Sequence, residues 1–319
     1  MTVSSFLPAA TQMIYDMGLQ RCLQGVSFEC PAIALQEQPV VVHCELAGKN
    51  LSSIEIDRLF AAAKASGRSI YSVDEPLLQQ IAPDIIFTQA TCEICQIDTI
   101  AAANVAGRLK KRPQLVELSP SNLSDVFTMA HTIAQAMEQP AAAIQYTGML
   151  QHRLDTIRRR LEGTGIKRVC LLEWTDPLYN CGHWIPDQLA CAGGIDMLSV
   201  PSGDSHMISW HRLLEYDPEI IVLAPCGYTV NRTLEDMPLL TGKPEWEQLQ
   251  AVHNNRVFIA DFSFFTQPSA STLVEGVEIL AACFHPSFFT VPVHLRERVL
   301  HFSIIGSMAI IGRNRRWPI

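Results

Sequence analysis

Two segments of this sequence repeat one pattern, and that repeat is the strongest constraint on the fold. Leu78–Phe87 reads LQQIAPDIIF, and Leu213–Val222 reads LLEYDPEIIV. Each segment has the residues of a helix end, a proline followed by an acidic residue, and an apolar, β-branched run suited to a buried parallel strand. A chain that carries this unit twice is expected to fold into two similar α/β halves.

Predicted strands and helical patterns alternate through both halves. The predicted strands are Val3–Leu7, Leu23–Phe28, Val40–His43, Asp84–Gln89 and Gln114–Leu118 in the first half, and Arg168–Trp174, Ile220–Ala224 and Arg256–Asp261 in the second. Ser52 and Glu55 have the spacing of a capping box, and Asp74 is an expected helix N-cap. Alternating strands and helices indicate parallel sheets covered on both faces. We therefore predict an α/β fold of two Rossmann-like lobes with parallel sheets, joined by a long helix.

The connecting helix is predicted from the region Leu123–Glu162, which is bent or broken near Pro140. Within it, Leu150, Leu154 and Ile157 recur at helical spacing on one face, which also fits a core helix of a single domain. We favour a rigid helix between two lobes. The predicted domains are an N-terminal lobe at 1–121, the helix at 122–163, a C-terminal lobe at 164–289 and an appended surface extension at 290–319.

Composition narrows the class of protein. The chain has 319 residues, 48% hydrophobic and 18% charged, with a formal net charge of −8, which fits a globular protein and argues against a nucleic-acid partner. The apolar stretch Phe302–Ile311 is too short to span a membrane. The N-terminus lacks the basic and apolar pattern of a secretory signal. We therefore expect a cytoplasmic protein, or a periplasmic one if a leader was removed, with its ten cysteines as thiols or ligands.

Residues that carry chemistry follow the predicted strands. Ligands of open parallel sheets bind at the carboxyl ends of the strands, where these residues would gather. The segments are Leu7–Thr11, Ser27–Cys30, Thr88–Cys95, Glu173–Trp174, Tyr179–Pro186, Ala224–Tyr228 and Phe262–Phe265. The serine-hydrolase elbow, the G-x-x-x-x-G-K-S/T loop and the Rossmann G-x-G-x-x-G motif are all absent from the sequence. An aromatic, thiol-rich site for a large, partly apolar ligand is the interpretation that remains.

The cysteines and one histidine also suggest a metal site. Cys92 and Cys95 form a single CxxC without the second pair of a zinc ribbon, so buried packing thiols are an equal alternative. Thiolates and imidazole are preferred ligands of zinc, copper and iron. The hypothetical ligands of a transition metal are Cys30, Cys92, Cys95, His183 and Cys226.

Several motifs together resemble a known family. LPAAT, LSSIEID, IAPDIIFTQ followed by CEIC, LEWTDP, GHWIPD, SWHRLLEYDPEIIVLAPCG and LVEGVEILAACFHP are similar to the cobalamin-binding, iron-complex-type (class III) substrate-binding proteins of ABC importers, over about residues 3–288. The resemblance implies two α/β lobes with a corrinoid or other metal chelate held between them, and no catalytic step. The alternative is a metal-binding protein or a metal- or thiol-dependent enzyme in the cytosol.

The resemblance leads to a set of predicted contacts with cobalamin. They are Pro8, Ala9, Thr11, Glu29, Cys30, Gln89, Cys92, Trp174, His183, Trp184, Cys226 and Phe265. His183 is in addition a candidate axial ligand of the cobalt, because imidazole is a common axial donor to metals in macrocycles. Members that dock on a transporter carry an acidic residue where this sequence has Pro76 and His211, with Glu75 one position away. This departure argues against docking to an ABC permease and favours a cytosolic binder.

Overall fold

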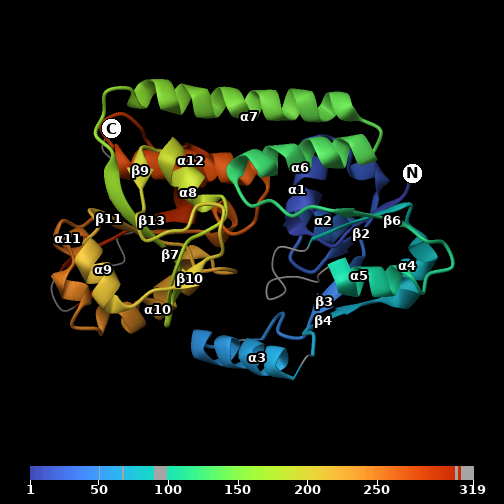
Figure 1. Cartoon of the computed structure of the whole chain (residues 1–319), viewed down its shortest axis with the longest axis horizontal. Coiled ribbons are helices and arrows are strands. Elements are labelled where there is room, and N and C mark those ends of the chain that lie inside the picture. The colour runs from blue at the N-terminus through green and yellow to red at the C-terminus, as the bar shows by residue number, and fades with distance from the viewer. Residues whose placement is uncertain (50, 67, 90–98, 306–307, 310–319) are drawn as a thin grey trace. The chain divides into compact units, whose positions relative to one another are not determined.

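The computed structural model describes residues 1–49, 51–66, 68–89, 99–305 and 308–309. The chain divides into two compact units. Unit 1 comprises Met1–Pro120 and Ser124–Gly148, and unit 2 comprises Ser121–Leu123 and Met149–Ile319. Each unit contains one large sheet with helices around it (Figure 1). The predicted α/β fold in two parts is confirmed.

Unit 1 is built on one mixed sheet. Its strands are β1 (Val3–Ser5), β2 (Leu23–Ser27), β3 (Val40–Cys44), β4 (Tyr71–Val73), β5 (Ile85–Thr88) and β6 (Gln114–Glu117). Its shorter helices are α1 (Pro8–Asp16), η1 (Gln20–Cys22), α2 (Ala32–Glu37), α3 (Ser53–Ala65), α4 (Glu75–Ile81) and α5 (Thr99–Ala106). The strand order is β4-β3-β2-β1-β5-β6, and every pair is parallel except β3 with β4. The order therefore reverses at β1, which lies between β2 and β5.

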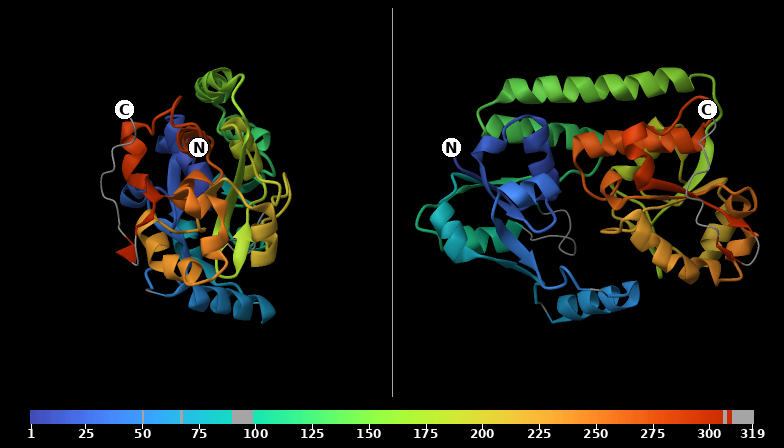
Figure 2. Two further views of the ribbon diagram at one scale, coloured as in Figure 1. Left: turned by 90° about the vertical axis from the view of Figure 1, so that its left-hand side faces the viewer. Right: turned by 180° about the vertical axis from the view of Figure 1, so that it is seen from behind.

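The predicted helical region Leu123–Glu162 forms two helices, α6 (Leu123–Ala136) and α7 (Pro140–Leu161). The interruption falls next to Pro140, as predicted, because proline lacks the N–H that would continue an upstream helix. The first half of α7 runs beside α6 (Figure 2), and Thr147 Oγ1 lies 3.2 Å from His131 Nε2. The boundary between the two units falls inside α7, after Gly148.

Unit 2 contains a second mixed sheet. Its strands are β7 (Lys167–Thr175), β8 (Leu178–Asn180), β9 (Gly194–Ile195), β10 (His206–Met207), β11 (Ile220–Leu223), β12 (Val257–Ala260) and β13 (Val299–Phe302), and a separate pair is β14 (Ile304–Ile305) with β15 (Met308–Ala309). Its helices are α8 (Ile185–Cys191), α9 (Trp210–Tyr216), α10 (Val230–Thr241), η2 (Trp246–Gln248), α11 (Gln250–His253), η3 (Phe262–Phe264), α12 (Ala270–Phe284) and η4 (Val293–Arg298). The order is β10-β8-β7-β11-β12-β13, with β9 beside β7.

Two expectations about the sheets need correction. Each predicted strand is present with ends shifted by at most two residues, but the sheets are mixed, because the pairs β3–β4, β7–β8, β8–β10 and β12–β13 are antiparallel. The expected surface extension from Thr290 is also wrong for its first part. β13 pairs with β12 and buries Val299 and Phe302, so this segment completes the sheet of unit 2.

The repeated segments fold alike. Helix α4 ends at Ala82, and α9 ends at Asp217, and both residues have left-handed backbone, with φ of 46° and 42°. A proline follows each and leads into β5 or β11. At their other ends, Asp74 accepts a hydrogen bond from Leu77 N and Ser209 accepts one from Arg212 N. The helix-turn-strand unit predicted in each half is thus confirmed.

Buried apolar side chains hold each sheet to its helices. In unit 1, Phe6, Val41 and Ile86 pack with Leu78 of α4, and in unit 2 Ile221 and Ile259 pack with Trp246. Full burial of such a side chain contributes roughly 1.5–3 kcal/mol. None of the helices in the described part of the chain combines the length and the apolar character needed to cross a bilayer.

Candidate functional site

The point where the strand order of unit 1 reverses carries six of the residues predicted to contact a ligand. Pro8, Ala9 and Thr11 follow β1, Glu29 and Cys30 follow β2, and Gln89 follows β5. The three strands are adjacent and parallel, so their carboxyl ends meet at one edge of the sheet. Open α/β sheets bind ligands at such a reversal. We refer to these six residues as the unit 1 edge.

The start of α1 supplies backbone donors to this edge. Pro8 occupies the first turn, where the missing N–H of proline costs nothing, and Leu7 provides no side-chain cap. Thr11 is fully buried, and its Oγ1 lies 3.1 Å from Cys30 Sγ. Burial raises the pKa of the Cys30 thiol, although contacts with Ser27 and Thr11 partly offset it. Cys30 is therefore a protonated thiol rather than an activated nucleophile.

Glu29 differs from its neighbours in the bonding of its carboxylate. Its side chain is half-buried, and no described residue gives it a hydrogen bond or an ion pair. Burial raises the pKa of Glu29 from its usual 4.5 to about 7. A half-buried carboxylate without a donor costs free energy in the unligated protein. The unit 1 edge thus offers an acceptor that a ligand could satisfy.

The structure describes only some of the other residues predicted near this edge. Gln89 is buried directly after β5. Cys92 and Cys95 lie outside the described residues. Among the residues that the structure does describe, there is no group of three histidine, cysteine or acidic side chains that could hold a metal ion. The metal site of Cys30, Cys92, Cys95, His183 and Cys226 stays a prediction.

In unit 2, Trp174 near the end of β7 packs on Tyr228, with ring centroids 5.2 Å apart. The Trp174 indole nitrogen is buried, and no hydrogen-bond acceptor meets it within the described part of the chain. Cys226, half-buried after β11, donates its backbone N–H to Glu173 O at 3.1 Å. Trp174 and Cys226 therefore lie on adjacent strand ends, as predicted.

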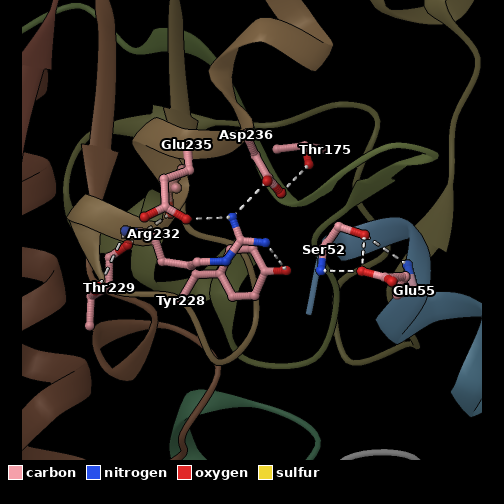
Figure 3. A network of polar contacts seen from close by, with 9 residues as sticks. Ser52, Glu55, Thr175, Tyr228, Thr229, Arg232, Glu235 and Asp236 are labelled. Carbon is pink, nitrogen blue, oxygen red and sulfur yellow. Dashed lines mark hydrogen bonds and ion pairs between the residues drawn. The ribbon is translucent and has the colours of Figure 1, made fainter. Parts of the chain in front are cut away.

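A charged network adjoins Tyr228, and the sequence did not reveal it (Figure 3). Arg232 on α10 donates to Asp236 Oδ1 at 2.7 Å and to Tyr228 Oη at 3.3 Å. Its guanidinium also lies over the Tyr228 ring, 4.4 Å from the centroid. Asp236 is buried and accepts from Thr175 Oγ1 at 3.4 Å. The only sequence signal was the i,i+4 spacing of Arg232 and Asp236 on a helix.

His183, Trp184 and Phe265 form a second group in unit 2. Trp184 Nε1 donates to Phe265 O at 2.6 Å, and both side chains are buried in the core. The His183 ring stacks on Trp184, and its Nε2 lies 3.8 Å from Asp204 Oδ1. Burial lowers the pKa of His183, and Asp204 partly offsets this shift. Contacts of these three residues with a ligand stay predictions.

The glycine before His183 has a packing reason. A Cβ at Gly182 would lie 2.3 Å from Gly203 O, so only glycine fits there. His183 itself has a positive φ of 51°, a conformation that few residues other than glycine adopt. The backbone therefore fixes the direction in which the imidazole leaves the chain.

Comparison with known proteins gives a family model and a fold. Residues 55–263 match the family model described as periplasmic binding protein. No curated protein sequence matches the chain. Similar solved structures include a periplasmic binding protein from Veillonella parvula, with 15% identity, a TM-score of 0.68 and coverage of 89% of this chain and 91% of that one.

Two further structures are named for their ligands. The periplasmic heme binding protein from Pseudomonas aeruginosa is 16% identical, with a TM-score of 0.67 over 92% of this chain and 96% of that one. The periplasmic vitamin B12 binding protein BtuF of Vibrio cholerae is 14% identical, with a TM-score of 0.63 over 90% and 97%. At these identities the likeness shows a shared fold.

Proposed function

Because the chain belongs to the periplasmic binding protein family, we propose that it binds cobalamin or a closely similar corrinoid, without a catalytic step. Proteins of the same fold are named for vitamin B12 and for heme, so a large metal complex is the expected kind of ligand. The proposed contacts are the twelve predicted from the sequence, six of them at the unit 1 edge. The choice among metal complexes depends on charge.

The unpartnered carboxylate of Glu29 is the observation that carries the choice of ligand. Burial alone shifts its pKa, and no cationic side chain contributes to the shift. In unit 2, the charge of Arg232 is already balanced by Asp236 and Glu235. A heme carries two propionates, which the ionised carboxylate of Glu29 would repel. A corrinoid carries neutral amides, whose N–H groups would donate to Glu29.

The aromatic pair of unit 2 supports the same class of ligand. Trp174 is partly exposed and packs on the buried Tyr228, so its ring offers an apolar surface suited to the edge of a macrocycle. Its indole N–H is buried and meets no acceptor in the described part of the chain.

We also propose His183 as the axial ligand of the cobalt. Its lowered pKa keeps the imidazole neutral at neutral pH, which is the form that coordinates a metal. Replacement by alanine is expected to change the absorbance spectrum of bound cobalamin. An unaltered spectrum would remove this role and leave binding itself intact.

Permease docking and cellular location stay predictions. Glu75, the acidic residue nearest the family's docking position in unit 1, is engaged by Arg108, whose Nε donates to it at 3.0 Å. The family is named for the periplasm, so the cytoplasmic location expected from the sequence has no support from the comparisons.

Calorimetric titration of the purified chain with three ligands tests the proposal. We expect cyanocobalamin to bind, and hemin and a ferric trihydroxamate siderophore to bind at least roughly tenfold more weakly, about 1.4 kcal/mol. Absorbance in the visible range reports the corrinoid directly. The absence of corrinoid binding at millimolar concentration would overturn the proposal.

Two variants test whether Glu29 contacts the bound cobalamin. Glu29→Gln keeps the shape and one acceptor but loses the charge, so its cobalamin affinity should fall by roughly tenfold, the effect of one charge-assisted hydrogen bond. Glu162→Gln removes the same charge from an exposed position after α7 and should leave the affinity unchanged. Equal affinities for both variants would exclude Glu29 as a contact.

A further inference from the structure

Unit 2 contains a cavity of about 400 Å³ at the edge of its sheet opposite to the predicted ligand residues. Lys167 begins β7, Ile220 begins β11, and Arg256 immediately precedes β12. These three strands are parallel and adjacent, so their amino ends form one edge. Phe284 at the end of α12 and His285 directly after it also line the cavity. Of the proposed cobalamin contacts of unit 2, Trp174, Cys226 and Phe265 lie at or after the carboxyl ends of the same strands.

Positive charge exceeds negative charge in this cavity. Glu219 is its acidic residue, and it lies 3.7 Å from Lys167 Nζ and 4.0 Å from Arg168 Nε. These two cations share one carboxylate, so together they carry more charge than Glu219 balances. Arg256 adds a further charge, and no carboxylate among the described residues lies within ion-pair distance of its guanidinium.

Arg256 is held in place but only partly satisfied. Its Nη2 donates to Cys283 O at 2.8 Å and to Phe284 O at 3.2 Å, at the carboxyl end of α12. Its Nε and Nη1 have no hydrogen-bond acceptor in the described part of the chain. Burial lowers the pKa of Arg256 because it removes water from around the guanidinium, and Cys283 and Glu219 partly offset this shift. A fixed, half-buried guanidinium with two free donors is suited to bind a planar or tetrahedral oxyanion.

The rest of the cavity wall is apolar or neutral. Ile220 and Phe284 are buried, and Pro286 and Phe288 extend the apolar surface. Burial lowers the pKa of His285, a hydrogen bond with Gly193 O partly offsets this shift, and Lys167 and Arg256 lower the pKa further, which favours the neutral imidazole. Its Nε2 faces Gly193 O at 3.4 Å. Cations on one side and apolar groups on the other fit a small molecule with an anionic group and an apolar body.

We propose that this cavity is a second binding site, which takes the phosphate or carboxylate group of a small organic anion on Arg256 and Lys167. The apolar body of the anion would pack on Pro286 and Phe288, which are the accessible apolar residues of the lining. This site is separate from the proposed corrinoid site and does not depend on it.

Calorimetric titration of the intact chain at low salt, with adenosine 5′-monophosphate, benzoate and inorganic phosphate, tests this proposal. We expect at least one of the two organic anions to bind more tightly than inorganic phosphate. The one that binds identifies phosphate or carboxylate as the recognised group. Binding of inorganic phosphate alone, or of none of the three at millimolar concentration, would overturn the proposal.

Variants assign the binding to the cavity. Arg256→Met should weaken the organic anion by roughly tenfold or more, because it removes a charged donor pair. Arg256 also holds the end of α12, so Lys167→Met at the start of β7 serves as a second variant that leaves this contact intact. Arg159→Met, at an exposed arginine of α7, is the matched control and should bind normally. Unchanged affinity in both cavity variants would place the anion elsewhere and overturn the site.

Discussion

Each unit has a carboxylate on the side of its sheet where a ligand is predicted to bind, Glu29 in unit 1 and Asp236 in unit 2. The two differ in their hydrogen-bond and ion-pair partners. Asp236 of unit 2 is buried, yet it accepts hydrogen bonds from Arg232 and Thr175. Glu29 of unit 1 is half-buried and has no partner among the described residues. Both lie beside residues predicted to contact a ligand.

The difference separates a structural carboxylate from a functional one. A paired buried charge stabilises the fold only through its partner, and removal of one member leaves the other uncompensated. An unpaired charge destabilises the free protein and becomes favourable only when a ligand supplies a donor. The Asp236 network therefore shapes unit 2, and Glu29 is available for binding.

The largest expected effect on the free energy of unfolding comes from replacing Asp236, the carboxylate that has partners. Asp236→Ala leaves Arg232, which is 23% exposed, without its nearest anion, so the free energy of unfolding should fall by about 2–4 kcal/mol. Glu235 lies 3.4 Å from the same guanidinium but is 67% exposed, so Glu235→Ala should cost less than about 0.5 kcal/mol. Urea unfolding of the two variants compares them directly. Equal losses would mean that Asp236 is no more structural than a surface acid.

Replacement of Glu29 is expected to raise the free energy of unfolding, by less than the Asp236 variant lowers it. Its pKa is raised in the folded state, from 4.5 to about 7, so the folded protein binds more protons than the unfolded chain between these values. The free energy of unfolding should therefore fall as pH rises through this window. Glu29→Gln should remove this fall and stabilise the unligated protein at pH 8 by about 1–2 kcal/mol, a value reduced for partial exposure.

Thermal or urea unfolding at pH 5 and pH 8 measures the Glu29 effect. The two proteins should differ little at the lower pH, where Glu29 is protonated in the folded state. A Glu29→Gln variant less stable than the parent at pH 8 would show that the carboxylate has a stabilising partner in solution.

The smallest effect on stability is expected at Ala82 and Asp217, the residues with positive φ in the two repeats. They differ as Glu29 and Asp236 do, because only the residue in unit 2 has a side chain with a hydrogen-bond partner in the described part of the chain. Ala82 makes no side-chain hydrogen bond, so Ala82→Gly should stabilise unit 1 by about 0.5–1 kcal/mol by relieving its positive φ. Asp217 Oδ1 accepts from Gln250 N at 2.8 Å, so Asp217→Gly relieves the same strain and loses this bond. The second variant should be neutral or destabilised. A gain in stability at Asp217 equal to that at Ala82 would contradict the assigned role of its carboxylate.

Interactions within a few residues could be predicted from the sequence. Ser52 and Glu55 bond reciprocally at the start of α3, with Ser52 N to Glu55 Oε2 at 2.8 Å (Figure 3). Asp74 caps α4 as expected. The repeated segments, Leu78–Phe87 and Leu213–Val222, correctly predicted a helix end, a turn and a strand in each half. In these cases a side chain meets the backbone three residues away, so the local sequence contains all the information.

Only the tertiary structure decided the edge strands and the state of the charged groups. β13 has only four residues, VLHF, and it is a strand because β12 offers it an unpaired edge. Thr175 and Asp236 meet across 61 residues of sequence. Within the described residues, Glu29 meets no hydrogen-bond donor, and Arg256 meets backbone carbonyls but no carboxylate. A residue's sequence neighbours reveal its propensity and its charge. Whether that charge is buried, and whether an opposite charge reaches it, depends on distant segments that the fold alone brings together.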